Sequence, residues 1–412
     1  LLAESKGQPE VNIGMVGHVD HGKTTLTKAL SGTWTDTHSE ERKRGISIKL
    51  GYADTTFYCT EDGDYYAKGK HPEGKKDSKK ELLRVVSFVD APGHETLMAV
   101  MISGASIMDG ALLLISATEK CPQPQTREHL AALEIAGIKN IVIVQNKIDL
   151  VSKERAIESF DEIREFVNGT LAENAPVIPI SAQQDVNLDV LIQAIEHTIP
   201  TPDRTKEDTG LMYVARSFDT NRPGARPNDL SGGIIGGSIV EGSFSVGDKI
   251  TIAPGRRIKV GNKTRWEPLE THIESIKGGG LNLETANAGG LCGIATPLDP
   301  VTTKADELSG QVMAKQGELP PIWETLELDL ELLEKMVAGV DGDSDSVRPL
   351  SMNEMLMINS ATATSVGTVT KKGKISKISL RLPICAKVGS RITLSRRVGS
   401  RWRLIGHGTI VG

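Results

Sequence analysis

The stretch GHVDHGKT, Gly17 to Thr24, decides the fold of this chain. It matches the pattern G-x-x-x-x-G-K-S/T, follows the apolar run VNIGMVG and leads into the helix-like run KTTLTKALSG. In that setting the backbone amides of the turn and of the helix N-terminus bind phosphate oxygens. Lys23 supplies charge to the β- and γ-phosphates, and the Thr24 hydroxyl binds Mg²⁺. We expect nucleotide contacts from Asp20, His21, Gly22, Lys23, Thr24 and Thr25.

Three further motifs follow in the order that a guanine nucleotide site requires. In DAPG, Asp90 is placed to hold the magnesium through water, and the Gly93 amide is placed to sense the γ-phosphate. In NKID, the Asp149 carboxylate can accept both N1–H and the exocyclic amine of guanine, a donor pair that adenine lacks. A backbone amide at the end of PVIPISA can reach the guanine carbonyl. These last two motifs predict GTP as the nucleotide, with contacts from Asn146, Lys147, Asp149, Ser181, Ala182 and Gln183.

Hydrolysis requires an in-line water and a residue that orients it. His94, directly after DAPG, is the candidate catalytic residue, and the alternative is a histidine that faces solvent at the start of a helix. The segment RKRGISIKL (42–50) is the expected first switch, in which the Ser47 hydroxyl completes the Mg²⁺ coordination when the γ-phosphate is present. Val19 and Ile46 are the expected apolar gate between His94 and the phosphate. Because no arginine finger can be identified within the chain, we expect slow intrinsic hydrolysis.

The pattern of apolar, polar and turn-forming residues changes twice along the chain. From residue 11 to about 200, short apolar runs alternate with amphipathic segments, which predicts a doubly wound α/β domain with a mostly parallel sheet. The Pro-rich, charged segment 200–210 indicates a linker, and short strands with Gly-rich turns then predict a small β-barrel. After GELPP (317–321) comes another β-rich region. The expected domains are therefore 1–203, 204–321 and 322–412, with an insertion at 58–81 in the first.

Composition narrows the class of protein. The chain has 412 residues and a formal net charge of -5, and no apolar run approaches the roughly 18 residues of a membrane span. No basic-then-apolar leader is recognisable at its start, so we expect an intracellular protein with no membrane partner. Its 4 cysteines are scattered without a C-x-x-C pair, which argues against disulfides and against a metal knuckle.

Charge is distributed unevenly along the chain. Residues 371–412 contain eleven Lys and Arg residues and no Asp or Glu, so the rest of the chain is strongly acidic. This predicts a C-terminal face that binds something acidic. The alternative is a solvated β surface on which the Lys and Arg stems cover apolar residues.

Several strings carry a resemblance to a known family. GHVDHGKT, RGISI and DAPGH resemble the translational GTPases, in which a G domain is followed by two β-barrels. SEERKRGISIKLGYA, KCPQPQTREHLAALEI, RSFDTNRPG with GGIIGGSIVEG, and SRRVGSRWRLIG are more specific. They resemble the gamma subunit of archaeal and eukaryotic translation initiation factor 2, in its archaeal form. The similarity covers residues 10–412 and implies an α/β P-loop GTPase domain followed by two β-barrel domains.

The resemblance implies partners and a second metal. It implies a heterotrimer in which this chain binds GTP and Mg²⁺ and carries methionylated initiator tRNA to the small ribosomal subunit in the cytoplasm. It places the alpha subunit on the second domain and the beta subunit on the G domain near the nucleotide. It also implies a second Mg²⁺ at Asp20 and the Gly45 carbonyl, although an Asp in a phosphate loop can instead form only structural hydrogen bonds.

The basic C-terminal region acquires a specific role in this family. A tRNA presents a dense phosphate backbone, and a protein that neutralises phosphates gains affinity by counterion release. We therefore expect Arg396, Arg397 and Arg401 to contact RNA. The same face can alternatively bind ribosomal RNA or an acidic subunit.

Three rival functions remain open on the sequence. The nearest is an elongation-type carrier of aminoacyl-tRNA, which shares the nucleotide motifs but has a shorter segment between Ser47 and Asp90. The others are a metabolic enzyme driven by GTP, such as a sulfate-activating subunit, and a scaffold that binds GTP without hydrolysing it.

The insertion YCTEDGDYYAKGKHPEGKKDSKKE (58–81) departs from the family pattern. Members of the family commonly carry four cysteines there, which form a zinc knuckle. Here Cys59 and His71 are the only candidate ligands, and two ligands cannot close a tetrahedral zinc site. We expect no zinc, and either a mobile loop or a short hairpin that turns at Asp62-Gly63 with Tyr65 and Tyr66 on its return strand.

Overall fold

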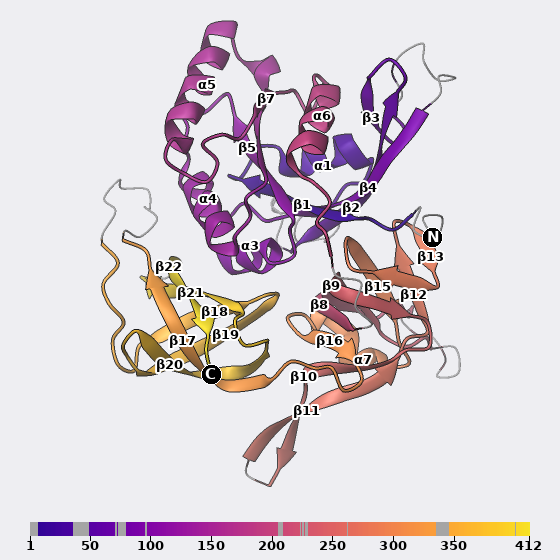
Figure 1. The fold of residues 1–412 in the computed structure, drawn as a ribbon, viewed down its shortest axis with the longest axis vertical. Helices are drawn as coiled ribbons and strands as arrows, with labels where there is room; N and C mark the ends of the chain where they lie inside the picture. Colours follow the sequence, from indigo (N-terminus) through magenta and orange to yellow (C-terminus); the bar gives the residue numbers. More distant parts are fainter. Residues whose placement is uncertain are drawn as a thin grey trace.

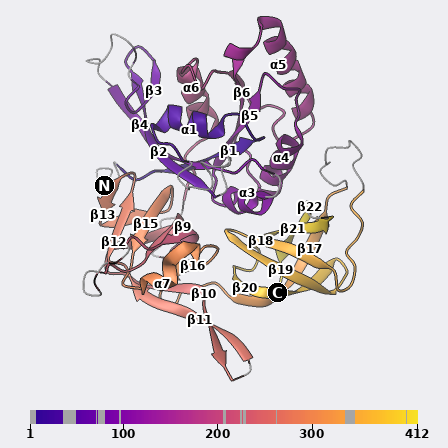
Figure 2. The ribbon, with the colours of Figure 1, turned by 180° about the vertical axis from the view of Figure 1, so that it is seen from behind.

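A computed structural model shows an α/β domain against which two β-rich regions pack side by side (Figures 1 and 2). The structure describes residues 7–35, 49–70, 72, 80–94, 97–204, 209–222, 224, 226, 230–261, 263–334, 346–399 and 401–412. No helix within these ranges is both long enough and apolar enough to cross a membrane.

The α/β domain is built on a seven-stranded sheet of order β3-β2-β4-β1-β5-β6-β7. The strands from β4 to β7 are parallel, whereas β2 and β3 are added antiparallel at one edge. The expected doubly wound, mostly parallel sheet is therefore confirmed. The strands are β1 (Val11–Gly17), β2 (Gly51–Thr60), β3 (Tyr65–Ala67), β4 (Lys80–Asp90), β5 (Gly110–Ser116), β6 (Ile141–Asn146) and β7 (Val177–Pro179).

Helices cover both faces of this sheet. Every residue of β1, β5 and β6 is buried, because the strands lie between two apolar layers. One core joins the sheet to α3, α4 and α5, and the other joins it to α1 and α6. The helices are α1 (Lys23–Ser31), α3 (Met98–Ala105), α4 (Pro124–Ala136), α5 (Lys153–Val167) and α6 (Leu188–Thr198), with a 3-10 turn η2 (Ile148–Leu150) before α5.

The middle region is a nine-stranded sheet around one apolar core. The described strands of this expected β-barrel follow the path β11-β10-β16-β8-β9-β15-β12-β13, with the three-residue strand β14 paired to β9. The ribbon of β10 and β11 projects away from the core (Figure 1). The elements are β8 (Gly210–Phe218), β9 (Ile234–Ser245), β10 (Lys249–Val260), β11 (Lys263–His272), β12 (Ser275–Gly278), β13 (Leu281–Leu283), β14 (Thr285–Asn287), β15 (Leu291–Ala295), α7 (Pro300–Thr303), η4 (Lys304–Asp306) and β16 (Val312–Lys315).

The last region is a closed barrel of order β17-β20-β19-β18-β21-β22, as expected. Its interior is filled by alternate apolar residues of every strand, as closure requires. The strands are β17 (Ile322–Leu332), β18 (Met355–Ser360), β19 (Ala363–Lys371), β20 (Ile375–Cys385), β21 (Arg391–Val398) and β22 (Arg401–Ile410). The domain limits 1–203, 204–321 and 322–412 stay our proposal.

The insertion contains the short hairpin that the sequence predicted as one of two alternatives. Strand β2 pairs with β3 in the register Cys59 to Tyr65, and Gly63 turns the chain with φ 87. The Tyr58 and Tyr66 rings stack with their centroids 5.4 Å apart. His71 and residues 73–79 lie outside the described residues, so the absence of zinc stays a prediction.

Candidate functional site

The phosphate loop lies at the carboxyl end of β1, where the neighbouring strands β4 and β5 flank it. Ligands of open parallel sheets bind at such an edge. Asp20 and Gly22 adopt left-handed backbone conformations, with φ 61 and φ 94. A side chain at Gly22 would place its Cβ 2.3 Å from Asn146 Nδ2, so this position requires glycine. Asp20 is exposed, and Thr25 lies in the first turn of α1.

Lys23 spans the phosphate loop. Its Nζ donates to the carbonyl oxygens of Gly17 at 3.0 Å and His18 at 2.7 Å. Gly93 lies against the same group, because a Cβ there would be 2.5 Å from Lys23 Nζ and 3.0 Å from Val19 N. The structure therefore brings the Gly93 loop into contact with the phosphate loop.

A group of oxygen donors lies beside Lys23 at the end of β4. Asp90 is 1% exposed, and its Oδ2 accepts hydrogen bonds from Thr24 Oγ1 at 2.8 Å and Thr35 Oγ1 at 2.6 Å. Hydroxyl and carboxylate oxygens are the ligands that Mg²⁺ prefers, so this donor set fits the ion. Sequence reasoning missed Thr35, since nothing in its spacing separates it from other hydroxyls before the switch segment.

The guanine end of the site is tied to the phosphate loop by Asn146. Its Nδ2 donates to the His21 carbonyl at 2.9 Å, and its Oδ1 accepts from the Ala182 amide at 3.1 Å. Lys147 follows in a left-handed conformation, φ 64, and the Asp149 carboxylate is exposed. Ser181 is buried and its carbonyl accepts from Val186 N, while Gln183 is exposed. The three loops that the sequence assigned to the nucleotide thus meet at one edge of the sheet.

Three histidines pack around the phosphate loop. His21 is 1% exposed, its Nδ1 contacts the Leu114 carbonyl at 2.9 Å, and burial lowers its pKa to about 3. Its Nε2 is 3.5 Å from a Glu119 oxygen, and since the ring is neutral this contact is not a charge pair. Burial also lowers the pKa of His18, whose ring lies 5.2 Å from that of His21.

The third histidine, His129, was given no role by the sequence. Its Nδ1 accepts the Gly17 amide hydrogen at 2.9 Å. Burial, followed by the nearby charge of Lys23, lowers its pKa to about 3. The only sequence signal was its place in the string QTREH, which carried the family resemblance without a physical explanation.

The expected catalytic and gating residues are described only in part. His94 is half-buried, and its carbonyl accepts from Leu97 N at 2.9 Å. Val19 is also half-buried. Gly45, Ile46 and Ser47 lie outside the described residues, so their predicted roles stay predictions.

One residue of the expected RNA face is wrongly assigned. Arg396 is 4% exposed, because its guanidinium pairs with Glu354 and donates to the Arg348 carbonyl at 3.0 Å. This arginine is held by the segment before β18 and is not part of an exposed face. Arg397 and Arg401 are exposed near the turn between β21 and β22.

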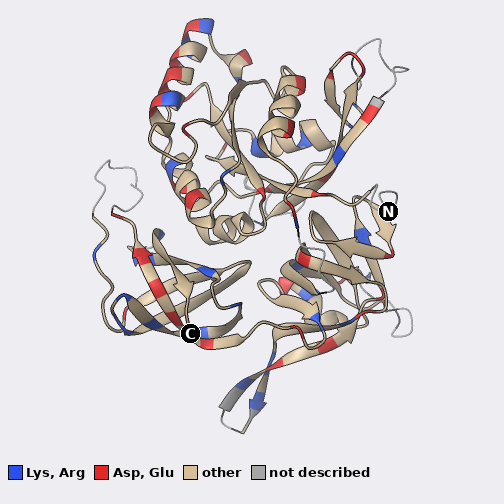
Figure 3. Cartoon of the chain, in the orientation of Figure 1, with Lys and Arg blue, Asp and Glu red and all other residues tan. Residues whose placement is uncertain are grey.

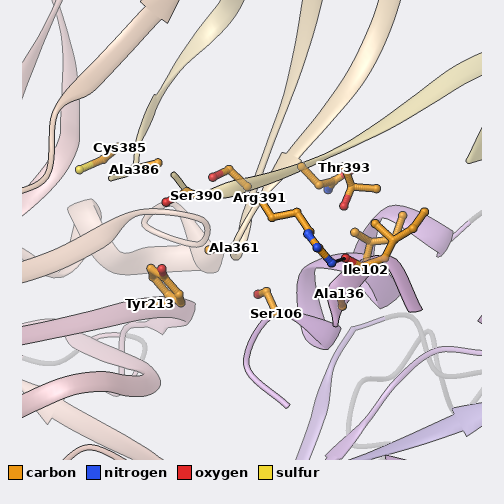
Figure 4. Close-up of a pocket in the computed structure, with 13 residues that line it drawn as sticks. Ile102, Ser106, Ala136, Tyr213, Ala361, Cys385, Ala386, Ser390, Arg391 and Thr393 are labelled. Atoms are coloured by element: carbon orange, nitrogen blue, oxygen red, sulfur yellow. Dashed lines mark hydrogen bonds between the residues drawn. The ribbon is translucent and has the colours of Figure 1, made fainter. Parts of the chain in front are cut away.

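The closed barrel packs on α3 and α4 of the α/β domain. Arg391 Nη1 donates to the Ile135 carbonyl at 2.6 Å, and Ser103 Oγ donates to the Thr362 carbonyl at 2.6 Å. A cavity of about 220 Å³ lies at this junction, between Ile102 of α3, Tyr213 of β8 and Arg391 of β21 (Figure 4). All three regions therefore meet around α3 and α4.

Comparison with known proteins agrees with this architecture. Residues 8–201 match the family model described as "Elongation factor Tu GTP binding domain", and residues 324–410 match "Initiation factor eIF2 gamma, C terminal". The chain is 56% identical to the translation initiation factor 2 subunit gamma of Methanocaldococcus jannaschii over 98% of each chain. It is 54% identical to the protein of that name from Halorubrum lacusprofundi, over 99% of this chain and 100% of the relative.

Solved structures share the fold at lower identity. Translation elongation factor SelB from Methanococcus maripaludis, in complex with the GTP analogue GppNHp, has a TM-score of 0.71 at 22% identity, with 97% of this chain and 78% of that one covered. A bacterial selenocysteine-specific elongation factor gives the same TM-score and identity, with 97% of this chain and 58% of that one covered.

The phosphate loop, the sheet order and the matched G domain define a translational GTPase, a class that binds GTP or GDP together with Mg²⁺. The identity over nearly the whole length is more specific. The chain belongs to the family of gamma subunits of translation initiation factor 2.

The buried position of Arg396 leads to a stability prediction. We expect Arg396→Gln to lower the free energy of unfolding by about 3 kcal/mol, because it leaves the Glu354 charge buried without its partner. Denaturant unfolding measures the change. Arg397→Gln, at the exposed neighbouring position, is the control and should change the free energy of unfolding by less than about 0.5 kcal/mol. Equal effects of the two substitutions would contradict the assignment.

Proposed function

We propose that this chain, in its GTP-bound form, carries methionylated initiator tRNA to the small ribosomal subunit in the cytoplasm, and that GTP hydrolysis switches it off. The observation that carries this proposal is the 56% identity over 98% of both chains with a named gamma subunit of initiation factor 2. An elongation-type aminoacyl-tRNA carrier is the alternative, and it shares only the fold at 22% identity.

The proposed nucleotide contacts follow from the geometry of the loops. The amides of residues 20–25 bind the phosphates. When the nucleotide binds, Lys23 Nζ donates to phosphate oxygens in place of the carbonyl oxygens of Gly17 and His18. Thr24, Ser47 and Asp90 hold one Mg²⁺, which when bound neutralises charge between the β- and γ-phosphates. The hydrogen bond between Thr24 and Asp90, 2.8 Å long, supports their shared role. We further propose that Asp20 and the Gly45 carbonyl hold a second Mg²⁺.

The proposed hydrolytic step uses His94 to orient the attacking water. Val19 and Ile46 separate its ring from the γ-phosphate until a trigger opens this gate. The Gly93 amide, next to His94, detects the γ-phosphate. Gly93 lies so close to Lys23 that a Cβ at this position would be 2.5 Å from Lys23 Nζ. This proximity supports the placement of the Gly93 loop at the phosphate.

Guanine specificity is testable at Asp149. We expect Asp149→Asn to weaken GTP binding about 100-fold, because the exocyclic amine of guanine loses its acceptor and the hydrogen bond from N1–H loses its charged partner. The same substitution should permit binding of xanthosine triphosphate, whose 2-oxo group accepts from the new amide. Competition with a fluorescent GTP analogue measures both affinities. Asp161→Asn, an exposed position on α5, is the control, and an unchanged GTP affinity in Asp149→Asn would reject the assignment.

The corrected RNA face is testable through its salt dependence. With a non-hydrolysable GTP analogue bound, we expect the chain to bind initiator tRNA more tightly than in the GDP form. Arg397→Glu with Arg401→Glu should weaken that binding and reduce the slope of log K against log salt by about 1 to 2. Filter binding across a salt series measures it, with Lys153→Glu on α5 as the control.

Two results would contradict these assignments. An unchanged salt slope in the double variant would reject the assignment of the surface at β21 and β22 to RNA binding. Preference for elongator over initiator tRNA would favour the elongation-type alternative.

We also propose sites for the other two subunits. The β10–β11 ribbon carries exposed basic side chains on the middle region, and it is the candidate site for the alpha subunit through an acidic surface of that partner (Figure 3). These side chains are Arg256, Arg257, Lys259 and Arg265. Leu150 follows Asp149 on η2, and Ile157 and Phe160 lie on α5; these three apolar side chains expose 66%, 53% and 39% of their surface. This apolar group is the candidate site for the beta subunit near the nucleotide.

Variants at each proposed subunit site serve as the control for variants at the other site. Lys259→Glu with Arg265→Glu should weaken binding of the alpha subunit at least about ten-fold and leave beta binding unchanged. Ile157→Ser with Phe160→Ser should do the reverse, because burial of each apolar side chain contributes about 1.5 kcal/mol or more. Calorimetric titration with each purified subunit measures both. Loss of both partners in one variant would indicate misfolding, and loss of neither would reject both sites.

A further inference from the structure

Helix α4 lies between the phosphate loop and the closed barrel, and it contacts both through neighbouring residues (Figure 1). His129 faces β1, whereas Glu128 and the last turn of the helix face the barrel. The proposed reaction so far assigns no role to any residue of this helix.

The contact with the phosphate loop is made at its first glycine. Gly17 N donates to His129 Nδ1 at 2.9 Å, and the histidine is 1% exposed, so no water can replace this acceptor without entering the core. Gly17 has φ 141, and a Cβ there would be 2.4 Å from the Leu114 carbonyl. The carbonyl of the same glycine accepts from Lys23 Nζ. His129 therefore fixes the residue that aligns Lys23.

The contact with the barrel is made at two points along the helix. Glu128 pairs with Arg403 of β22, and the two side chains are only 6% and 13% exposed. Arg391 of β21 donates to the Ile135 carbonyl in the last turn of α4 at 2.6 Å. A cation at this end also complements the partial negative charge of the helix C-terminus. The barrel thus holds the helix at both its first half and its end.

We propose that His129 is a positioning residue for the phosphate loop and that α4 couples the docking of the closed barrel to nucleotide binding. The proposal rests on nucleotide binding at this loop. Because Glu128 and His129 are consecutive, a shift of the helix when Arg403 withdraws moves the acceptor of the Gly17 amide. Nucleotide affinity then depends on the barrel through α4.

The first test removes only the acceptor. His129→Leu should weaken binding of both a fluorescent GTP analogue and fluorescent GDP about five-fold, because the buried Gly17 amide loses its hydrogen bond. His129→Asn, whose side-chain oxygen lies near the position of Nδ1, should restore most of the affinity. Thermal unfolding of each variant shows that it is folded. An unchanged affinity in a folded His129→Leu variant would overturn the positioning role.

The second test addresses the coupling. Glu128→Gln with Arg403→Gln should weaken nucleotide binding about two- to five-fold. The triple variant that also carries His129→Leu should lose no more affinity than His129→Leu alone, because both changes act on one contact. Lys387→Gln breaks a more exposed pair, between Lys387 and Glu241 of the middle region, and should leave nucleotide affinity unchanged. Equal effects of the Glu128/Arg403 and Lys387 variants, or fully additive losses, would overturn the coupling. Failure of the unmodified chain to bind GTP analogue would instead reject the proposed function.

Discussion

The site depends on the Asn146 side chain, which holds the phosphate loop and the guanine loop together. Its amide donates to the His21 carbonyl and its carbonyl accepts from the Ala182 amide, so one side chain joins the ends of β1, β6 and β7. The close approach also explains Gly22, where a Cβ would lie 2.3 Å from the Asn146 nitrogen. The order of the strands brings the phosphate loop and the guanine loop to the same edge of the sheet. The Asn146 contacts then fix the distance between these two loops.

A carboxylate, that of Asp306, joins the α/β domain to the middle region. Asp306 accepts from Lys49, from Arg216 Nε at 2.8 Å and from the Ser217 amide at 3.1 Å. Burial raises the pKa of Asp306, but the hydrogen bonds from Lys49 and Arg216 outweigh burial and leave the pKa below its usual value. Lys49 is the first described residue of the switch segment 42–50, and Arg216 Nη1 also contacts the carbonyl of Leu50, its last residue, at 3.4 Å. The end of the switch is therefore anchored on another region of the chain.

The sequence predicted the parts of this molecule that local chemistry dictates. The phosphate loop, DAPG and NKID carry their residue types for reasons that hold in any parallel sheet, so their meeting was predictable. The sequence did not predict contacts between residues of distant segments. Thr35 joins Asp90 across 55 positions, and His129 joins Gly17 across 112. No spacing rule reports such contacts, because only the packed sheet brings these elements together.

The basic C-terminal region shows why composition alone misassigns individual residues. Arg396 is the last of five consecutive buried residues of β21, and Arg397 is the first of two exposed ones. Successive side chains of a strand point to opposite sides, so adjacent arginines can differ in this way. Arg396 has a carboxylate, Glu354, and two backbone carbonyls within reach, which satisfies a buried guanidinium. Arg397 has no such enclosure and is exposed. A count of basic residues therefore overstates the charge available to an acidic partner, and the exposed members must be identified from strand register before any of them is assigned to RNA.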